Sequence, residues 1–302
     1  MKYNMKRLHL RPGDLSIPEM AHILTGAVGP RPIALASTVD PDGNPNLSPF
    51  SFFNAFGSNP PILIFSPARK GRDNTTKHTY ENLKLVDEVV INVVTYGMVQ
   101  QISLASSDFP KGVNEFEKAG FTMEPSELVK PLRVAESPVQ FECRVLQIIE
   151  TGDQAAAGNL VICRIVAIHI DESILDSNGN IDPHKIDLVG RLGGDFYCRA
   201  SGNAVFSVEK PLSTPGIGID SLPELVRLSH ILTGNDLGRL GNLKTLPSES
   251  AVAEAQLSDA VVAIFKQNDT TDERALALQK LARLKIDDGD LPGALTVLMI
   301  SP

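Results

Sequence analysis

The chain has 302 residues, of which 42% are hydrophobic and 21% are charged, as in an ordinary globular protein. Its net charge of -8 disfavours nucleic acid and anionic membranes as partners, because both are negatively charged. No apolar run approaches the roughly 20 residues that span a bilayer, and residues 1–20 lack the apolar stretch of a signal peptide. Cys143, Cys163 and Cys198 are odd in number and far apart, which predicts reduced thiols and a cytoplasmic protein.

Strand patterns dominate the first two-thirds of the chain. The expected strands are Arg31–Val39, Leu47–Phe53, Ile62–Ser66, Glu88–Thr95, Pro138–Glu150 and Asn159–Ile170. The first two flank a turn rich in Asp, Pro, Gly and Asn, so we expect them to form a hairpin. Short helices are expected around NTTKHTYENLKL, with Asn74 as N-cap, and around YGMVQQISLASS and VNEFEKAG. Strands with scattered helices, without strict β-α alternation, predict a mainly β barrel.

The character of the sequence changes after Pro211. The Gly- and Pro-rich segment STPGIGIDSLP leads into a helical tail that runs to about Ile300. Capping-box patterns at Ser221 and Thr270 predict helix starts, and Gly234 is an expected helix stop. We therefore expect a β domain over residues 1–211 and a helical C-terminal extension over residues 212–302.

Familiar catalytic and nucleotide-binding signatures are absent from the sequence. It has no GxGxxG after a strand, no GxxxxGK[ST], no HExxH and no GxSxG, and its six histidines are isolated. No metal-ligand spacing occurs. We therefore assign no catalytic side chain and no metal ligand, and expect a bound organic cofactor to carry the chemistry.

The most unusual segment is LSPFSFFNAFGSNPP, residues 47–61, which sets four phenylalanines among small polar residues. A core strand followed by a turn is one interpretation. The other is a site for a flat ligand, in which serines contact a polar ring edge and a phenylalanine covers the apolar part. Because side chains alternate along a strand, either Ser51 and Phe53 or Phe52 would face the ligand, unless the strand bulges.

Two further segments are suited to anions. SPARKGRDNTTKHT, residues 66–79, is basic and precedes an expected helix, which favours a phosphate site, with a solvated basic loop as the alternative. LVGRLGGDFY, residues 188–197, offers two glycines for close backbone approach and Arg191 for an anion.

Together, five segments resemble the flavin reductase-like FMN-binding split-barrel family, and more narrowly its flavoredoxin-type branch. They are RPIALASTVDPDGNPNLSPFSFFNAFGSNPP, FSPARKGRDNTTKHTYENL, EVVINVV, SPVQFEC and RLGGDFY. The resemblance implies a mainly β, FMN-binding split barrel with flanking helices, followed here by the helical C-terminal extension. It also implies a homodimer with FMN near the interface.

The resemblance implies a set of FMN-binding residues as well. Those expected along the flavin ring and ribityl chain are Ser37, Thr38, Ser48, Pro49, Phe50, Ser51, Phe52, Phe53 and Asn54. Those expected on the phosphate side are Ser66, Arg69, Lys77 and Thr79. Arg191, from the glycine-rich segment, completes the set.

The function implied by the resemblance is that of an FMN-dependent oxidoreductase, which moves hydride from a nicotinamide to a flavin or a small acceptor. Two positions depart from the family. The segment GRLGGDFY lacks the histidine of a Gly-Asp-Arg-His run, and His78 replaces an aspartate between Lys77 and Thr79. A non-enzymatic FMN electron carrier with a protein partner is one alternative, and a structural or ligand-sensing barrel without flavin is another.

Overall fold

The computed structural model describes residues 5–208, 210 and 214–302. The chain divides into two compact units, one spanning Leu8–Phe206 and the other containing Ser207–Pro302. Each unit has its own hydrophobic core. Among the described residues, no helix is long and apolar enough to cross a membrane.

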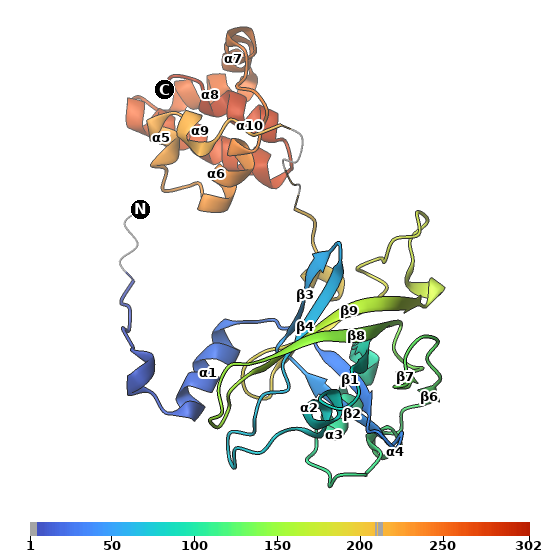
Figure 1. Cartoon of the computed structure of the whole chain (residues 1–302). Coiled ribbons are helices and arrows are strands. Elements are labelled where there is room, and N and C mark those ends of the chain that lie inside the picture. Colours follow the sequence, from blue (N-terminus) through green and yellow to red (C-terminus); the bar gives the residue numbers. More distant parts are fainter. Residues whose placement is uncertain (1–4, 209, 211–213) are drawn as a thin grey trace. The chain divides into compact units, whose positions relative to one another are not determined.

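A seven-stranded antiparallel sheet forms the first unit, so the mainly β prediction is confirmed. Its strands are β1 (Ala34–Val39), β2 (Pro45–Phe50), β3 (Phe53–Ser58), β4 (Pro61–Phe65), β5 (Glu88–Val93), β8 (Val139–Glu150) and β9 (Asn159–Ile170). Their order is β2-β1-β5-β8-β9-β4-β3, and the long strands β8 and β9 run side by side (Figure 1). The expected hairpin is present, because Ala34 of β1 pairs with Phe50 of β2.

Strand β1 is buried along its whole length because it lies between two hydrophobic cores. Its side chains alternate, so that Ala34 and Ala36 enter one core and Leu35 enters the other. Helices α3 (Val99–Ala105) and α4 (Glu115–Ala119) cover the second core and pack against β2. This packing brings the loop after α3 beside β2.

Smaller elements flank the sheet. They are α1 (Ile17–Ala27), α2 (His78–Leu83) and two short strand pairs, β6 (Met123–Glu124) with β7 (Arg133–Val134) and β10 (Val189–Arg191) with β11 (Tyr197–Arg199). The backbones of Arg31 and Arg191 exchange two hydrogen bonds, of 3.0 and 2.9 Å, and so attach β10 to the segment before β1. Every residue of α1 is exposed or half-buried.

The helix expected to begin after Asn74 starts later than predicted. Lys77 is the N-cap of α2, which spans only His78–Leu83. Asn74 has φ of 59°, a left-handed conformation that asparagine tolerates, and its side-chain oxygen accepts a hydrogen bond from Arg69 Nε. The turn around Asn74 therefore replaces the predicted first helical turn.

The strand predicted over Leu47–Phe53 is also wrong in its extent. Strand β2 ends at Phe50, the chain bends at Ser51 and Phe52, and β3 begins at Phe53. The bend lets β2 pair with β1 while β3 pairs with β4. Strict alternation of side chains therefore does not hold across the segment.

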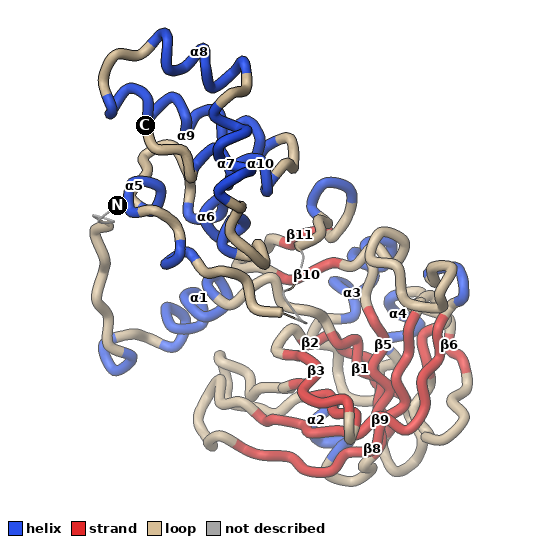
Figure 2. The backbone as a smooth tube through the Cα atoms, turned by 90° about the horizontal axis from the view of Figure 1, so that it is seen from above, coloured by secondary structure: helices blue, strands red, loops and turns tan. Residues whose placement is uncertain are grey.

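The C-terminal unit is helical, as predicted, and Figure 2 shows its helices as one group. They are α5 (Glu224–Arg227), α6 (Gly234–Gly241), α7 (Glu249–Gln256), α8 (Asp259–Gln267), α9 (Thr271–Asp287) and α10 (Leu291–Leu298). The capping box at Thr270 is confirmed. The box at Ser221 is wrong, because Ser221 Oγ donates to the carbonyl oxygen of Ile217, and Gly234 begins α6 instead of ending a helix.

Candidate functional site

Two adjoining hollows lie along β2. The first is lined by Asn46, Ser48, Lys70, Lys77, His78, Thr79, Ala105, Ser106, Ser107, Asp108, Phe109 and Glu115. The second, of about 320 Å³, is lined by Ile33, Pro49, Ser51, Ile102, Ser103, Ser106, Arg191, Asp195 and Tyr197. Because Ser106 lines both and β2 contributes neighbouring residues to each, we treat the two hollows as one elongated site.

Lys77 is a half-buried cation in the first hollow. It forms no ion pair with any residue that the structure describes. Burial lowers the pKa of Lys77, and the nearby charge of Lys70 lowers it further. A bound anion would compensate both effects, because an opposite charge stabilises the protonated amine.

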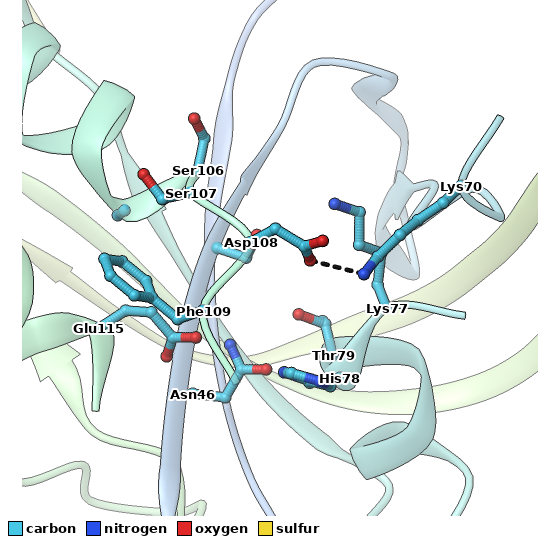
Figure 3. Close-up of a pocket in the computed structure, with 12 residues that line it drawn as sticks. Asn46, Lys70, Lys77, His78, Thr79, Ser106, Ser107, Asp108, Phe109 and Glu115 are labelled. Atoms are coloured by element: carbon cyan, nitrogen blue, oxygen red, sulfur yellow. Dashed lines mark hydrogen bonds and ion pairs between the residues drawn. The ribbon is translucent and has the colours of Figure 1, made fainter. Parts of the chain in front are cut away.

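Two buried polar atoms near Lys77 also lack hydrogen-bond partners within the described structure. They are Oγ1 of Thr79, a residue that is 1% exposed, and Oδ1 of Asn46, a residue that is 7% exposed. Figure 3 shows both side chains at the hollow that Lys77 also lines. Buried polar groups are nearly always hydrogen-bonded, so these two atoms indicate a bound polar group.

Asp108 lies across the first hollow from the lysines. Its Oδ1 accepts a hydrogen bond from Lys70 Nζ at 2.5 Å, and its Oδ2 pairs with Arg72 (Figure 3 shows the Lys70 contact). The Lys70 hydrogen bond, opposed by partial desolvation and reinforced by Arg72, lowers the pKa of Asp108. The remaining cavity is about 30 Å³, which suits a water-sized group. A phosphate at Lys77 and Thr79 would therefore displace the Asp108 carboxylate from Lys70.

Glu115 closes the other side of the first hollow. Its carboxylate is buried, and Oε2 accepts a hydrogen bond from the backbone N–H of Leu47 at 3.0 Å. This contact fixes α4 to β2. Burial raises the pKa of Glu115, and the hydrogen bond from the backbone of Leu47 opposes this shift.

The second hollow combines an apolar wall with positive charge. The apolar wall consists of Ile33, Pro49 and Ile102. The Arg191 guanidinium stacks on the ring of Tyr197, 4.5 Å from its centroid. The hydroxyl of Ser51 lines the hollow and lies 3.4 Å from Nε of Arg31 behind it. An apolar surface edged by a hydroxyl and a cation suits a flat heterocycle with a polar edge.

The structure brings together six of the residues expected from the sequence to bind FMN. Ser48, Lys77 and Thr79 line the first hollow, and Pro49, Ser51 and Arg191 line the second. The phosphate-side and ring-side groups thus occupy neighbouring parts of one site.

The phenylalanines and Asn54 lie elsewhere. Phe50 packs in the core, 5.5 Å from the ring of Phe65, and Phe53 packs half-buried against the same core. Phe52 is 48% exposed, so it is not a core residue. Asn54 is exposed, and its side-chain oxygen accepts a hydrogen bond from the next backbone N–H. One expected register turned Ser51 and Phe53 toward the ligand, and the other turned Phe52 toward it. Ser51 lines the second hollow, whereas Phe52 and Phe53 do not.

Of the remaining expected residues, Ser66, Arg69 and Thr38 form side-chain hydrogen bonds within the protein, whereas Ser37 does not among the described residues. Ser66 Oγ accepts from the backbone N–H of Asn159 at 3.1 Å, and Arg69 donates to the side chain and backbone of Asn74. Thr38 Oγ1 accepts from Asn82 Nδ2 at 3.2 Å. Ser37 is fully buried in β1, and its hydroxyl has no partner among the described residues.

Sequence reasoning missed several residues of the site, notably Asn46, Asp108 and Glu115, and it missed Arg31, which lies beside the second hollow. Asp108 and Glu115 follow α3 in the chain and reach the hollow only because α3 and α4 pack on β2. No local pattern marks either of them. Arg31 begins an expected strand, but its position beside the hollow could not be predicted, because it depends on the contact with β10.

Comparisons with known proteins identify the family of this chain. The family model for the flavin reductase like domain matches residues 28–184. An uncharacterized protein of Aquifex aeolicus is 37% identical over 186 residues, which cover 62% of this chain and 92% of that protein.

Solved structures are also similar to this chain. Nitrilotriacetate monooxygenase component B from Bacillus cereus is 28% identical with a TM-score of 0.63, covering 68% of this chain and 100% of that one. The 2-nitrobenzoate 2-nitroreductase of Pseudomonas fluorescens is 29% identical with a TM-score of 0.58, covering 67% and 96%. Flavoredoxin of Desulfovibrio vulgaris, at 23% identity and a TM-score of 0.53, shares the fold.

Proposed function

The chain belongs to the flavin reductase-like domain family, and from this premise we propose that it binds FMN and acts as an FMN-dependent oxidoreductase. The family and the split-barrel fold expected from the sequence are confirmed. A flavin reductase-like function follows from the family. The choice of FMN and the enzymatic reaction are proposed from the site.

The observation that carries the proposal is that, among the described residues, Lys77 has no ion-pair partner and the nearby hydroxyl of Thr79 has no hydrogen-bond partner. In this proposal both hold the FMN phosphate, and Ser48 lies between the phosphate and the ring. A lysine and a hydroxyl donor are groups that bind phosphate through charge-assisted hydrogen bonds. Lys77 and Thr79 offer one cation and one hydroxyl to a single phosphate group, as in FMN.

The second hollow would hold the flavin ring. In this proposal the apolar wall would shield one face of the ring from water. Ser51 would contact the polar edge of the ring, and Arg191 would supply positive charge. When bound, the flavin supplies two-electron transfer between a nicotinamide donor and a flavin or small-molecule acceptor. The protein's own residues bind and orient the ring, and we assign no side chain to proton transfer.

We also propose a homodimer. Helix α1 exposes the apolar side chains of Ile17, Ile23 and Leu24, each more than two-fifths accessible. An apolar helix face of this kind is typical of a surface that a partner covers. A second copy of the chain is the partner proposed. We further propose that residues 1–211 form the flavin domain and residues 212–302 a separate helical domain.

The absorption spectrum of the purified protein tests the proposed function. After incubation with FMN and removal of free flavin, we expect two flavin bands in the visible region and release of FMN on denaturation. We expect the loaded protein to oxidise NADH or NADPH. Flavin uptake without nicotinamide oxidation would favour the electron carrier instead. A colourless protein that takes up neither FMN nor FAD would contradict the proposal.

A further inference from the structure

Arg31 is a buried cation beside the second hollow, although it does not line it. The residue is 6% exposed, and its guanidinium donates to the carbonyl oxygens of Thr25 and Val28, both at 2.6 Å, and of Leu192 at 3.0 Å. Its Nε donates to Ser51 Oγ at 3.4 Å. Among the described residues, no carboxylate lies within ion-pair distance of it. Buried charges are as a rule paired, so an uncompensated one requires an explanation.

A second cation reinforces the positive charge. The backbones of Arg31 and Arg191 are hydrogen-bonded to each other. Asp195, the one carboxylate near Arg191 in the described part of the chain, lies 4.0 Å away with a fully exposed side chain. Burial, and then the charge of Arg191, lower the pKa of Arg31, which nevertheless stays protonated because an arginine titrates far above neutral pH. The wall behind Ser51 therefore carries excess positive charge.

We propose that Arg31 is a positioning residue that tunes the bound flavin, because its charge behind Ser51 favours the reduced, anionic flavin over the oxidised, neutral one. This inference rests on the proposed function, since it takes the flavin ring to occupy the second hollow. Addition of a hydride from a nicotinamide brings two electrons and one proton to a neutral flavin, so the product carries one more negative charge. A fixed cation nearby stabilises that charge.

Ser51 links Arg31 to the hollow. A hydroxyl has one O–H donor and two acceptor lone pairs. Since Ser51 Oγ accepts from Arg31 Nε, its own proton is available to a group in the hollow. Arg31 therefore orients a donor toward the ring as well as supplying charge. The guanidinium is held by the carbonyl groups of Thr25 in α1 and of Leu192 after β10, which fix its orientation behind Ser51.

A purely structural role is the competing explanation, because Arg31 also ties α1 to the segment after β10. Variants that keep or remove the positive charge at position 31 distinguish the two explanations. Arg31→Lys keeps the charge but loses most of the hydrogen bonds, whereas Arg31→Gln and Arg31→Met lose the charge. Arg199→Gln is a matched control, since Arg199 is a nearby arginine whose charge is compensated by Asp187 at 2.6 Å.

The test is the midpoint potential of FMN bound to the full-length wild type and to these variants, with thermal unfolding measured in parallel. In the neutral variants we expect the preference for reduced over oxidised FMN to fall roughly tenfold, a shift of about 30 mV to more negative potential for a two-electron couple. Arg31→Lys should shift by less than half of that, and Arg199→Gln should not shift.

The inference is overturned if a folded, FMN-loaded Arg31→Gln or Arg31→Met variant has the wild-type potential. The wild type provides a second measurement that needs no variant. Its bound FMN should have a less negative potential than free FMN, and a more negative one would also overturn the inference. A wild type that takes up no flavin would instead overturn the proposed function, and this inference with it.

Discussion

In the proposed FMN complex, the Asp108 carboxylate would lie close to the phosphate held by Lys77, because both line the first hollow. Lys70 and Arg72 bind the Asp108 carboxylate, whereas Lys77 is left without an ion pair among the described residues. In the proposed complex, phosphate entry would replace one anion with another at Lys70. If FMN binds as proposed, its affinity would depend on how tightly Asp108 is held.

Replacement of this competing anion should strengthen FMN binding. In Asp108→Asn we expect the dissociation constant for FMN to fall about twofold to fivefold, because an exposed ion pair contributes little to the affinity. Binding of riboflavin, which has no phosphate, should not change. Asp73→Asn is the control, since Asp73 pairs with Arg72 at 2.8 Å but does not line the hollow. Weaker FMN binding to Asp108→Asn would show that Asp108 orders the site instead of competing for it.

At this scale the sequence predicted some of the site's residues and not others. Lys77 and Thr79 could be predicted from the sequence because they lie together in one basic segment. Asp108 and Glu115 could not be predicted, because tertiary packing alone brings them to β2. Arg69 looked like a phosphate ligand, but its guanidinium is bound to Asn74 in a local turn. The sequence shows which charged side chains the segment contains, and the tertiary packing decides which of them remain able to bind a ligand.

At the scale of elements, Glu142 fixes β8 to the segment before β7. It is fully buried, and its carboxylate accepts hydrogen bonds from the backbone N–H groups of Glu127 at 2.8 Å and Leu128 at 2.6 Å. His169 Nε2 lies 2.7 Å from the same carboxylate. Burial raises the pKa of Glu142, but the hydrogen bonds outweigh it and hold the pKa below its usual value.

This contact predicts an acid-sensitive contribution to stability. Because the pKa of Glu142 is lower in the folded state, the contribution is fully present above the usual glutamate pKa and is lost as the pH falls through the folded-state pKa. At pH 7, Glu142→Gln should lose about 1.5–3 kcal/mol of unfolding free energy, as expected for hydrogen bonds to a charged group. Urea titrations from pH 7 to pH 3 should show this difference shrinking. The exposed Glu254→Gln is the control, and a pH-independent difference would contradict the assignment.

Helix α1 is the element on which the proposed dimer depends. In Leu24→Glu we expect the dimer to dissociate at least tenfold more readily, because a charge would replace an apolar contact. Sedimentation velocity over a concentration series measures this. Leu257→Glu is the control, since Leu257 is an exposed leucine in the C-terminal unit. A wild type that sediments as a monomer at micromolar concentration would contradict the dimer, and an unchanged Leu24→Glu dimer would place its interface elsewhere.

Element prediction succeeded where the pattern was long and failed where tertiary contacts decide. Strands β8 and β9 match their predicted ranges within one residue. Helix α1 was missed, although Ser16 and Glu19 form a capping box with Pro18 in the first turn. The bend at Ser51 and Phe52 could not be predicted, because it arises from β2 and β3 pairing with different strands.

For the whole molecule, every residue lining the two hollows lies within the unit that spans Leu8–Phe206. A chain that ends at Phe206 should therefore keep the FMN affinity of the full-length protein. Equilibrium titration of both forms, with circular dichroism to confirm that the truncated chain is folded, measures this. A folded truncated chain that no longer binds FMN would show that the helical extension contributes to the site.

The central claim is that Lys77 binds the phosphate of FMN, and the affinities of Lys77→Ala for FMN and riboflavin test it most directly. We expect FMN binding to weaken about tenfold or more, because a charge-assisted hydrogen bond contributes about 1.5–3 kcal/mol. Riboflavin binding should stay unchanged. Lys84→Ala, which removes an exposed lysine paired with Glu150, should leave both affinities unchanged. An equal loss of affinity for FMN and riboflavin, or no loss for either, would contradict the claim.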